Sequence, residues 1–395
     1  MNYQNHFGEE ISVLGYGCMR FPKRAGKTDL VKSEKQILRA VEQGVNYFDT
    51  AYLYPESEAS LGYIVERNNL RKNIKIASKL PLMFVRSYED FDKFFNITLK
   101  RLKTDYIDYY LMHNMCTISK WKELVELGIE DWIHKQKCAG RIRNVGFSSH
   151  GTESEFLGLL DVYNWDFCQI QYNYMNENYQ AGTKGLKAAA KKGIMVVIME
   201  PLLGGKLAHS LPPQAVKLIN DKFKGKTPAE TALGWLWNKP EVAVVLSGMN
   251  SDEQIDENVG IASAVTPNSL PKEEVDEYPN LINAFRSGYK IPCTGCNYCQ
   301  PCPKNVDIAD LFSAYNMSYA LGRFEGIKQF FTGHLGRPSS VSLCVQCRKC
   351  EEHCPQNIKI ADEVKRASKR IQPWFINFIS LAAGRLVLKR KRKHK

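Results

Sequence analysis

Eight short, apolar, β-branched runs alternate with helical segments along the first two thirds of the chain. Two of them, VVIM and VAVVL, are continuously apolar, as parallel strands buried on both faces should be. Eight strands and their helices over roughly 264 residues match the size of a (β/α)8 barrel, an α/β fold. An open doubly wound sheet is disfavoured, because no G-x-G-x-x-G follows the first run. We predict strands at Ser12–Gly17, Val45–Thr50, Ile74–Lys79, Tyr106–His113, Asn144–Ser148, Phe167–Tyr172, Met195–Met199 and Val242–Gly248.

Helix starts are marked between these runs. Three pairs fit the capping box, and Pro228 after Thr227 adds a proline at a first helical position. The three capping-box pairs are Ser33 with Gln36, Thr152 with Glu155, and Ser251 with Gln254.

The net charge is concentrated at the C-terminal end. Of the formal charge of +12, eleven Lys and Arg with no acidic residue lie after residue 364, which leaves residues 1–364 at +1. The basic pI therefore describes a tail, which argues against a nucleic-acid-binding protein. The N-terminus, MNYQNHFGEE, has no apolar signal segment, and no apolar run reaches the roughly 18 residues of a membrane span. We expect a cytoplasmic protein with reduced thiols.

Eight of the twelve cysteines form two runs near the C-terminus: Cys293-x2-Cys296-x2-Cys299-x2-Cys302-Pro303 and Cys344-x2-Cys347-x2-Cys350-x3-Cys354-Pro355. The second has the full spacing of a bacterial [4Fe–4S] run. Three thiolates two residues apart can wrap one cluster, and a fourth that directly precedes proline points to another. We predict two [4Fe–4S] clusters, one on Cys293, Cys296, Cys299 and Cys354, the other on Cys344, Cys347, Cys350 and Cys302.

Structural zinc and disulfides are the alternatives for these runs. Zinc sites usually use separated C-x2-C pairs, and disulfides conflict with a reducing compartment. The other cysteines, Cys18, Cys116, Cys138 and Cys168, are interpreted as small buried hydrophobic residues.

The segment 266–291 is rich in proline and mixed in charge, which is typical of a domain junction. We predict a barrel over 1–265, a linker and dicluster domain over 266–372, and a separate tail over 373–395.

Four titratable residues lie at or just after the ends of predicted strands. Asp49, Lys79 and His113 end the second, third and fourth strands, and Tyr54 follows the second. The carboxyl ends of the strands carry the chemistry in a (β/α)8 barrel. Each residue alone is explained by an ion pair or a cap, but four at successive strand ends favour an active site.

Several segments resemble the aldo/keto reductase family in order and spacing: NYFDTAYLY, SEASLG, IASK, DYYLMH, GRIRNVGFSS and QIQYN, within residues 10–260. The cysteine domain is similar to the ferredoxin-type extension of one branch of that family. The resemblance implies that Tyr54 protonates a carbonyl oxygen and that Lys79 lowers the pKa of Tyr54. It further implies that Asp49 keeps Lys79 charged, that His113 orients the carbonyl, and that a nicotinamide supplies hydride.

The resemblance also implies cofactor contacts. Ser148, Ser149 and Gln169 stand where the family holds the carboxamide, and Met199 stands where a tyrosine usually stacks on the ring. Gly248 replaces a usual Lys and Gln254 a common Arg, which favours NADH over NADPH, because a phosphate without a cation is poorly held. The remaining implied contacts are Gly17, Pro201, Leu202, Ser251, Glu257 and Asn258.

These features predict an oxidoreductase that reduces a small carbonyl compound, or oxidises an alcohol, with NAD(P)H. Hydride carries two electrons and a cluster passes one, so a flavin normally stands between them. The alternative is therefore an electron-transfer module, in which the barrel binds a flavin or docks a one-electron redox protein. A third interpretation is a redox-sensing regulator.

The tail combines an apolar helix face over 374–388 with the basic end LKRKRKHK. An amphipathic helix beside basic residues suits the anionic inner surface of a membrane, so we predict peripheral attachment there. The alternative is a helix that packs on its own barrel, followed by a solvated basic end.

Overall fold

The computed structural model describes residues 1–178, 180–209, 211–293, 295, 299–320, 322–324, 326–327, 330, 343–354 and 356–372. The chain divides into two compact units. The first comprises Met1–His209 and Lys226–Asp276, and the second comprises Ser210–Gly225 and the chain from Glu277 onward. The predicted tail helix over 374–388 lies outside the described residues. Within them, no helix has the length and apolar character needed to cross a bilayer.

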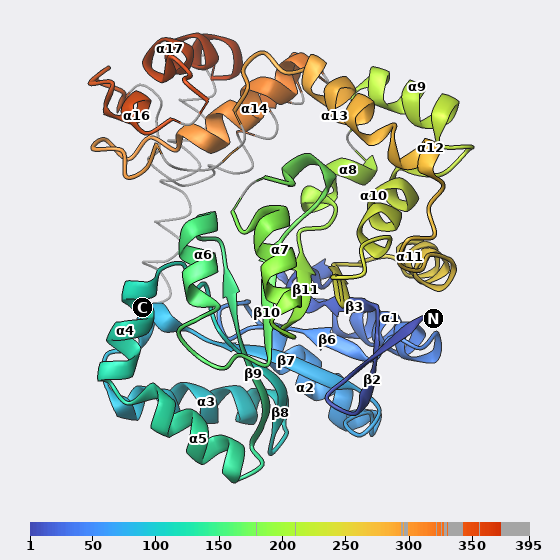
Figure 1. The fold of residues 1–395 in the computed structure, drawn as a ribbon, viewed down its shortest axis with the longest axis vertical. Coiled ribbons are helices and arrows are strands. Elements are labelled where there is room, and N and C mark those ends of the chain that lie inside the picture. The colour runs from blue at the N-terminus through green and yellow to red at the C-terminus, as the bar shows by residue number, and fades with distance from the viewer. Residues whose placement is uncertain are drawn as a thin grey trace. The chain divides into compact units, whose positions relative to one another are not determined.

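All eight predicted strands form, and they close into one parallel barrel, which confirms the predicted fold class (Figure 1). The strand order around the barrel is β3-β6-β7-β8-β9-β10-β11-β12. The ends differ from the predicted ones by up to two residues, and His113 lies just after its strand. The strands are β3 (Leu14–Gly17), β6 (Tyr47–Asp49), β7 (Lys75–Leu80), β8 (Ile107–Met112), β9 (Ile142–Ser149), β10 (Phe167–Gln171), β11 (Met195–Met199) and β12 (Val244–Ser247).

Alternate residues of these strands fill the barrel interior. Tyr47, Ala77 and Phe167 belong to one buried cluster inside the barrel. Side chains two residues apart on a strand share a face, so Asp49, Lys79 and Gln169 point inward directly above that cluster. The strand period therefore sets polar groups on top of an apolar core, at the carboxyl ends of the strands.

Helices surround the barrel strands (Figure 1). Three predicted N-caps are confirmed, because the hydroxyl groups of Thr152, Thr227 and Ser251 each accept a hydrogen bond from the backbone N–H three residues on. The predicted cap at Ser33 is wrong, since α1 begins after Asp29. The helices are α1 (Leu30–Glu42), α2 (Ser57–Arg67), α3 (Tyr88–Leu102), α4 (Ile118–Glu126), α5 (Ile129–Cys138), α6 (Glu153–Leu159), α7 (Gly182–Lys191), α8 (Lys206–His209), α10 (Pro228–Trp237), α11 (Asp252–Ala264) and α12 (Lys272–Val275).

Two antiparallel hairpins were not predicted. One pairs β1 (Tyr3–His6) with β2 (Glu9–Ser12), and the other pairs β4 (Lys23–Arg24) with β5 (Lys27–Thr28). Cys18 and Cys168 are buried as predicted, whereas Cys116 is half-buried and Cys138 is exposed on α5, so the buried interpretation is wrong for these two.

The second unit contains an excursion from the barrel sequence. Helix α9 (Pro213–Lys222) packs on α13 (Tyr278–Ser287), and the rings of Phe223 and Tyr278 meet edge to face with centroids 5.2 Å apart. Residues 266–276, by contrast, belong with the barrel, where Glu274 accepts a hydrogen bond of 2.6 Å from Lys226. The predicted boundary after residue 265 assigned Ser210–Gly225 to the barrel and 266–276 to the second domain, whereas the structure divides these segments the other way.

The core of the second unit is built from α14 (Ile308–Ala320) and α17 (Ile360–Ile371), with the short α16 (Lys349–Glu352) beside α17. Its buried residues include Leu311, Phe312, Val364 and Ala367. Cysteines of both runs pack against this core: Cys293, Cys299, Cys302, Cys344, Cys350 and Cys354.

Candidate functional site

A buried ion pair lies at the mouth of the barrel. Lys79, 1% exposed, donates to both carboxylate oxygens of Asp49 at 2.7 Å and to the Thr50 carbonyl at 2.8 Å. Burial alone would lower the pKa of Lys79, but Asp49 and Tyr54 together outweigh burial and raise it. The ammonium is thus held charged, and removing its carboxylate partner would cost about 3–5 kcal/mol.

Tyr54 lies beside this pair, in the loop after β6. The Lys79 ammonium is 5.1 Å from the centre of the Tyr54 ring. Burial raises the pKa of Tyr54, and the charge of Lys79 opposes that rise without cancelling it. The expected effect of Lys79 is present, but the phenol stays protonated at neutral pH, which is the state a proton donor requires.

His113 faces Tyr54 from the loop after β8. The two rings meet edge to face, with centroids 6.0 Å apart. Burial, assisted by the charges of Lys79 and His150, lowers the pKa of His113 to about 3. Its Nδ1 is buried without a hydrogen-bond partner among the described residues. The structure therefore brings Asp49, Tyr54, Lys79 and His113 together, with a neutral imidazole beside a protonated phenol.

This neutral imidazole has a testable consequence for pH dependence. A histidine whose pKa is about 3 does not titrate at working pH, so carbonyl reduction should show no His113 ionisation between about pH 5 and 8. The pH profile of kcat/KM for wild type and for His113→Gln measures this. Both profiles should be parallel, with the variant lower throughout. A limb near pH 6.5 that disappears in the variant would contradict the neutral assignment.

The predicted carboxamide contacts lie on neighbouring strands. Ser148 and Ser149 end β9, and both are buried. Their hydroxyls accept backbone hydrogen bonds, from Asn114 at 2.9 Å and from Gly151 at 3.1 Å. Gln169 on β10 is 2% exposed, and its Oε1 has no hydrogen-bond partner among the described residues. A buried acceptor of this kind fits the N–H groups of a carboxamide.

The next strand contributes apolar groups. Met199 ends β11 half-buried and packs against the barrel core, Pro201 is buried, and Leu202 is half-buried. Gly17 ends β3, and a Cβ there would lie 3.4 Å from the Ser247 carbonyl oxygen. These residues share the carboxyl end of the barrel, as predicted, and the thioether of Met199 offers a soft contact for a planar ring.

The predicted phosphate contacts are used within the protein. The Ser251 hydroxyl accepts from Gln254 N, and Gln254 Oε1 accepts from Asn250 N at 2.9 Å, so the pair caps α11. Asn258 donates to Ser247 at 2.9 Å, and Glu257 accepts from Thr227 at 2.6 Å. The segment lies at the carboxyl end of the barrel strands, as a cofactor contact requires, but these side chains form hydrogen bonds within the protein.

Sequence reasoning missed Gln171, two residues after Gln169 on β10. It is 2% exposed, and both its amide oxygen and its amide nitrogen lack partners among the described residues. The shared strand face was the available signal, because the QIQ pattern sets both amides toward the barrel interior.

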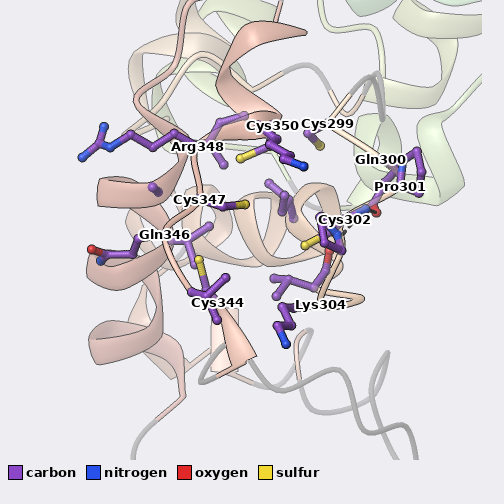
Figure 2. Close-up of a pocket in the computed structure, with 18 of the residues that line it drawn as sticks. Cys299, Gln300, Pro301, Cys302, Lys304, Cys344, Gln346, Cys347, Arg348 and Cys350 are labelled. Carbon is purple, nitrogen blue, oxygen red and sulfur yellow. Dashed lines mark hydrogen bonds between the residues drawn. The ribbon is translucent and has the colours of Figure 1, made fainter.

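A second site lies wholly within the second unit. A cavity of about 180 Å³ is lined by Cys302 together with Cys344, Cys347 and Cys350. Cys299 of the first run also lines this cavity, and Figure 2 shows it beside Cys350. Burial, followed by the charge of Glu351 and the neighbouring Cys344 and Cys302, raises the pKa of Cys350 to about 11. Cys302 therefore lies with the second run, but so does Cys299, which the ligand prediction assigns to the other cluster, so the exchange of ligands stays a prediction. Cys296 lies outside the described residues.

The donor set and the space fit an iron–sulfur cluster. Thiolate sulfur is the usual ligand of such clusters, and four zinc-binding sulfurs would lie about 2.3 Å from a single ion, with no cavity between them. A cluster also explains why thiols gather here although their surroundings disfavour the thiolate form of Cys350, since bound iron stabilises that form.

Comparisons with known proteins agree with both sites. Residues 13–279 match the model of the aldo/keto reductase family, and residues 292–359 match that of a 4Fe-4S dicluster domain. L-galactose dehydrogenase of Arabidopsis thaliana is 23% identical over 300 residues, covering 71% of this chain and 93% of its own length. Aldo-keto reductase str7 of Strobilurus tenacellus is 23% identical over 310 residues, covering 67% and 87%.

A solved structure extends this likeness to the fold. The aldo-keto reductase AKR11C1 from Bacillus halodurans, in its holo form, superposes with a TM-score of 0.58 at 25% identity, covering 71% of this chain and 96% of that one. The matched models, the closed barrel and the cysteine-lined cavity lead to one assignment. This chain belongs to the aldo/keto reductase family and carries a C-terminal 4Fe-4S dicluster domain.

Proposed function

We propose that the barrel reduces a small carbonyl compound, or oxidises the corresponding alcohol, with NADH as the favoured cofactor. The observation that carries this proposal is the charged Lys79–Asp49 pair beneath a protonated Tyr54 and a neutral His113. A protein that used the barrel only as a scaffold would have no need for a buried charge beside a phenol.

The four residues divide the work of carbonyl reduction. A bound nicotinamide supplies the hydride. Tyr54 donates its proton to the carbonyl oxygen, and the fixed charge of Lys79 stabilises the phenolate that results. A neutral His113 can donate an N–H to the same oxygen, and its low pKa keeps it from competing as an acid. Asp49 holds Lys79 in place and charged.

The preference for NADH rests on the segment Ser247–Asn258. It contains no Lys or Arg and four acidic residues: Asp252, Glu253, Asp256 and Glu257. Two of them, Asp252 and Glu253, stand in the first turn of α11. The acidic first turn repels a 2′-phosphate, and Lys35 beside it is already paired with Asp252 at 2.6 Å, which disfavours NADPH.

A second candidate function is one-electron transfer through the clusters, with a flavin in the barrel or a redox protein bound outside. Residues 345–349, which carry Cys347, are exposed, and Val345 is 60% exposed. A partner could therefore approach the cavity of the second run from solvent. Met199 in place of a stacking aromatic ring also favours this candidate.

Anaerobically purified protein distinguishes the two candidates. NADH oxidation should depend on an added aldehyde or ketone, and denaturation should release no stoichiometric flavin. If NADH instead bleaches the clusters without any carbonyl, or if flavin is released in stoichiometric amount, the electron-transfer candidate replaces carbonyl reduction.

Membrane contact of the tail remains a proposal that rests on the sequence. The full chain should co-sediment with vesicles that contain anionic lipid and should be released by high salt, because exposed charges are screened within about 10 Å at 0.1 M. A chain that ends at Gln372 should stay in the supernatant and keep its iron. The membrane proposal fails if the shortened chain aggregates or loses iron while the full chain does not co-sediment with these vesicles at low salt.

A further inference from the structure

An exposed arginine spans several loops at the mouth of the barrel. Arg20 ends the 3-10 turn η1 (Cys18–Arg20), directly after β3. Its Nη1 donates to the Gly204 carbonyl at 3.2 Å, within the 3-10 turn η4 (Leu203–Gly205) that follows β11. Among the described residues this is the only hydrogen bond recorded for Arg20, and it leaves most guanidinium donors available.

Two glycines make room for this side chain. A Cβ at Gly248 would lie 3.3 Å from Cδ of Arg20 and 3.6 Å from its Cγ, so the arginine stem rests on the backbone after β12. A Cβ at Gly204 would lie 3.3 Å from Nη2 of Arg20. The stem thus occupies the space that a side chain at position 248 would fill.

The position of Arg20 around the ring of strands indicates which part of a bound dinucleotide it could contact. Asp49, Tyr54, Lys79 and His113 lie at the ends of β6, β7 and β8 or in the loops that follow them, and the buried amide of Gln169 lies on β10. Arg20 joins the loops of β11, β12 and β3, which are neighbours and complete the ring. A nicotinamide held between Tyr54 and Gln169 can extend the rest of its dinucleotide only over the remaining part of the mouth.

From this geometry we infer that Arg20 binds the diphosphate of the dinucleotide, and that Gly248 permits it by leaving space for the arginine stem. A planar guanidinium with free donors suits paired phosphate oxygens. The inference rests on the proposed function, because it takes a nicotinamide dinucleotide as the cofactor.

Calorimetric titration with ADP-ribose tests the phosphate contact without nicotinamide or turnover. Arg20→Ala should weaken binding about ten- to one-hundred-fold and should reduce its dependence on salt. Lys191→Ala is the control for loss of one positive charge. Lys191 is exposed at the C-terminal end of α7, which lies at the opposite face of the barrel from the strand ends, so its loss should change binding less than twofold.

The position of the cation is tested by moving it. The double variant Arg20→Ala with Gly248→Lys should recover about tenfold of the lost affinity, because removing the stem frees the space above residue 248. Gly248→Val should weaken ADP-ribose binding with Arg20 still present, since the new side chain meets the arginine stem. Thermal unfolding of each variant establishes that it is folded.

The inference is overturned if wild type does not bind ADP-ribose, if Arg20→Ala binds it as wild type does, or if a weakened Arg20→Ala regains nothing from Gly248→Lys. Failure of the proposed function looks different. In that case ADP-ribose binds through Arg20, but the protein reduces no carbonyl compound and Tyr54→Phe changes nothing.

Discussion

Replacing Tyr54 by Phe should lower the rate of carbonyl reduction about 10²- to 10⁴-fold. The substitution removes the hydroxyl that we propose as the proton donor and keeps the ring that contacts His113 and Lys79. Because only the proton transfer is lost, the affinity for NADH should barely change. Single-turnover rates with a true substrate, together with NADH titration by fluorescence, measure the two quantities separately.

Tyr52→Phe is the matched control. Tyr52 lies in the same loop, where its ring faces the Arg101 guanidinium and meets the Phe94 ring edge to face. The same chemical change there should leave turnover within about twofold of wild type. Unchanged turnover in Tyr54→Phe on a substrate that the protein truly uses would show that another group donates the proton.

Replacing Cys302 by Ser should remove the cluster of the second run and leave that of the first. Wild type should contain about eight iron and eight sulfide per chain, and the variant about half of each. The reason is spatial, because Cys302 belongs to the first run in sequence but lines the cavity of Cys344, Cys347 and Cys350. Iron and sulfide analysis after anaerobic purification, with electron paramagnetic resonance of the reduced protein, gives the result.

Cys354→Ser is the reciprocal variant and should spare the cluster on the second run. Cys138→Ser is the control, because this exposed thiol on α5 belongs to neither run and its loss should leave the iron content unchanged. Zinc in place of iron, without acid-labile sulfide, would refute both clusters. Loss of the same cluster in Cys302→Ser and Cys354→Ser would refute the exchanged ligands.

The barrel and the position of the candidate residues at its mouth could be predicted from the sequence because they depend on local periodicity. Apolar runs of strand length set the barrel, and the strand period then set Asp49 and Lys79 on its inner face. The cysteine spacing was equally informative, because a cluster fixes its ligands at short separations along the chain.

Other features were hidden because they depend on three-dimensional neighbours. Ser33 has a good capping residue type, yet it lies inside α1, where its hydroxyl donates to the Asp29 carbonyl, and Asp29 takes the cap. The rise in the pKa of Tyr54 depends on how deeply the loop buries it, which spacing does not reveal. The contact between Arg20 and Gly248 joins residues 228 positions apart.

The excursion Ser210–Gly225 changes how the two units are tethered. The chain passes from barrel to second unit after His209, returns at Lys226, and leaves again after Asp276. Three covalent crossings therefore join the units, rather than the single linker of a simple fusion. A fragment that starts at Glu277 would lack α9 and expose the Tyr278 ring that Phe223 covers. The iron–sulfur unit is therefore not a cassette that can be excised with one cut.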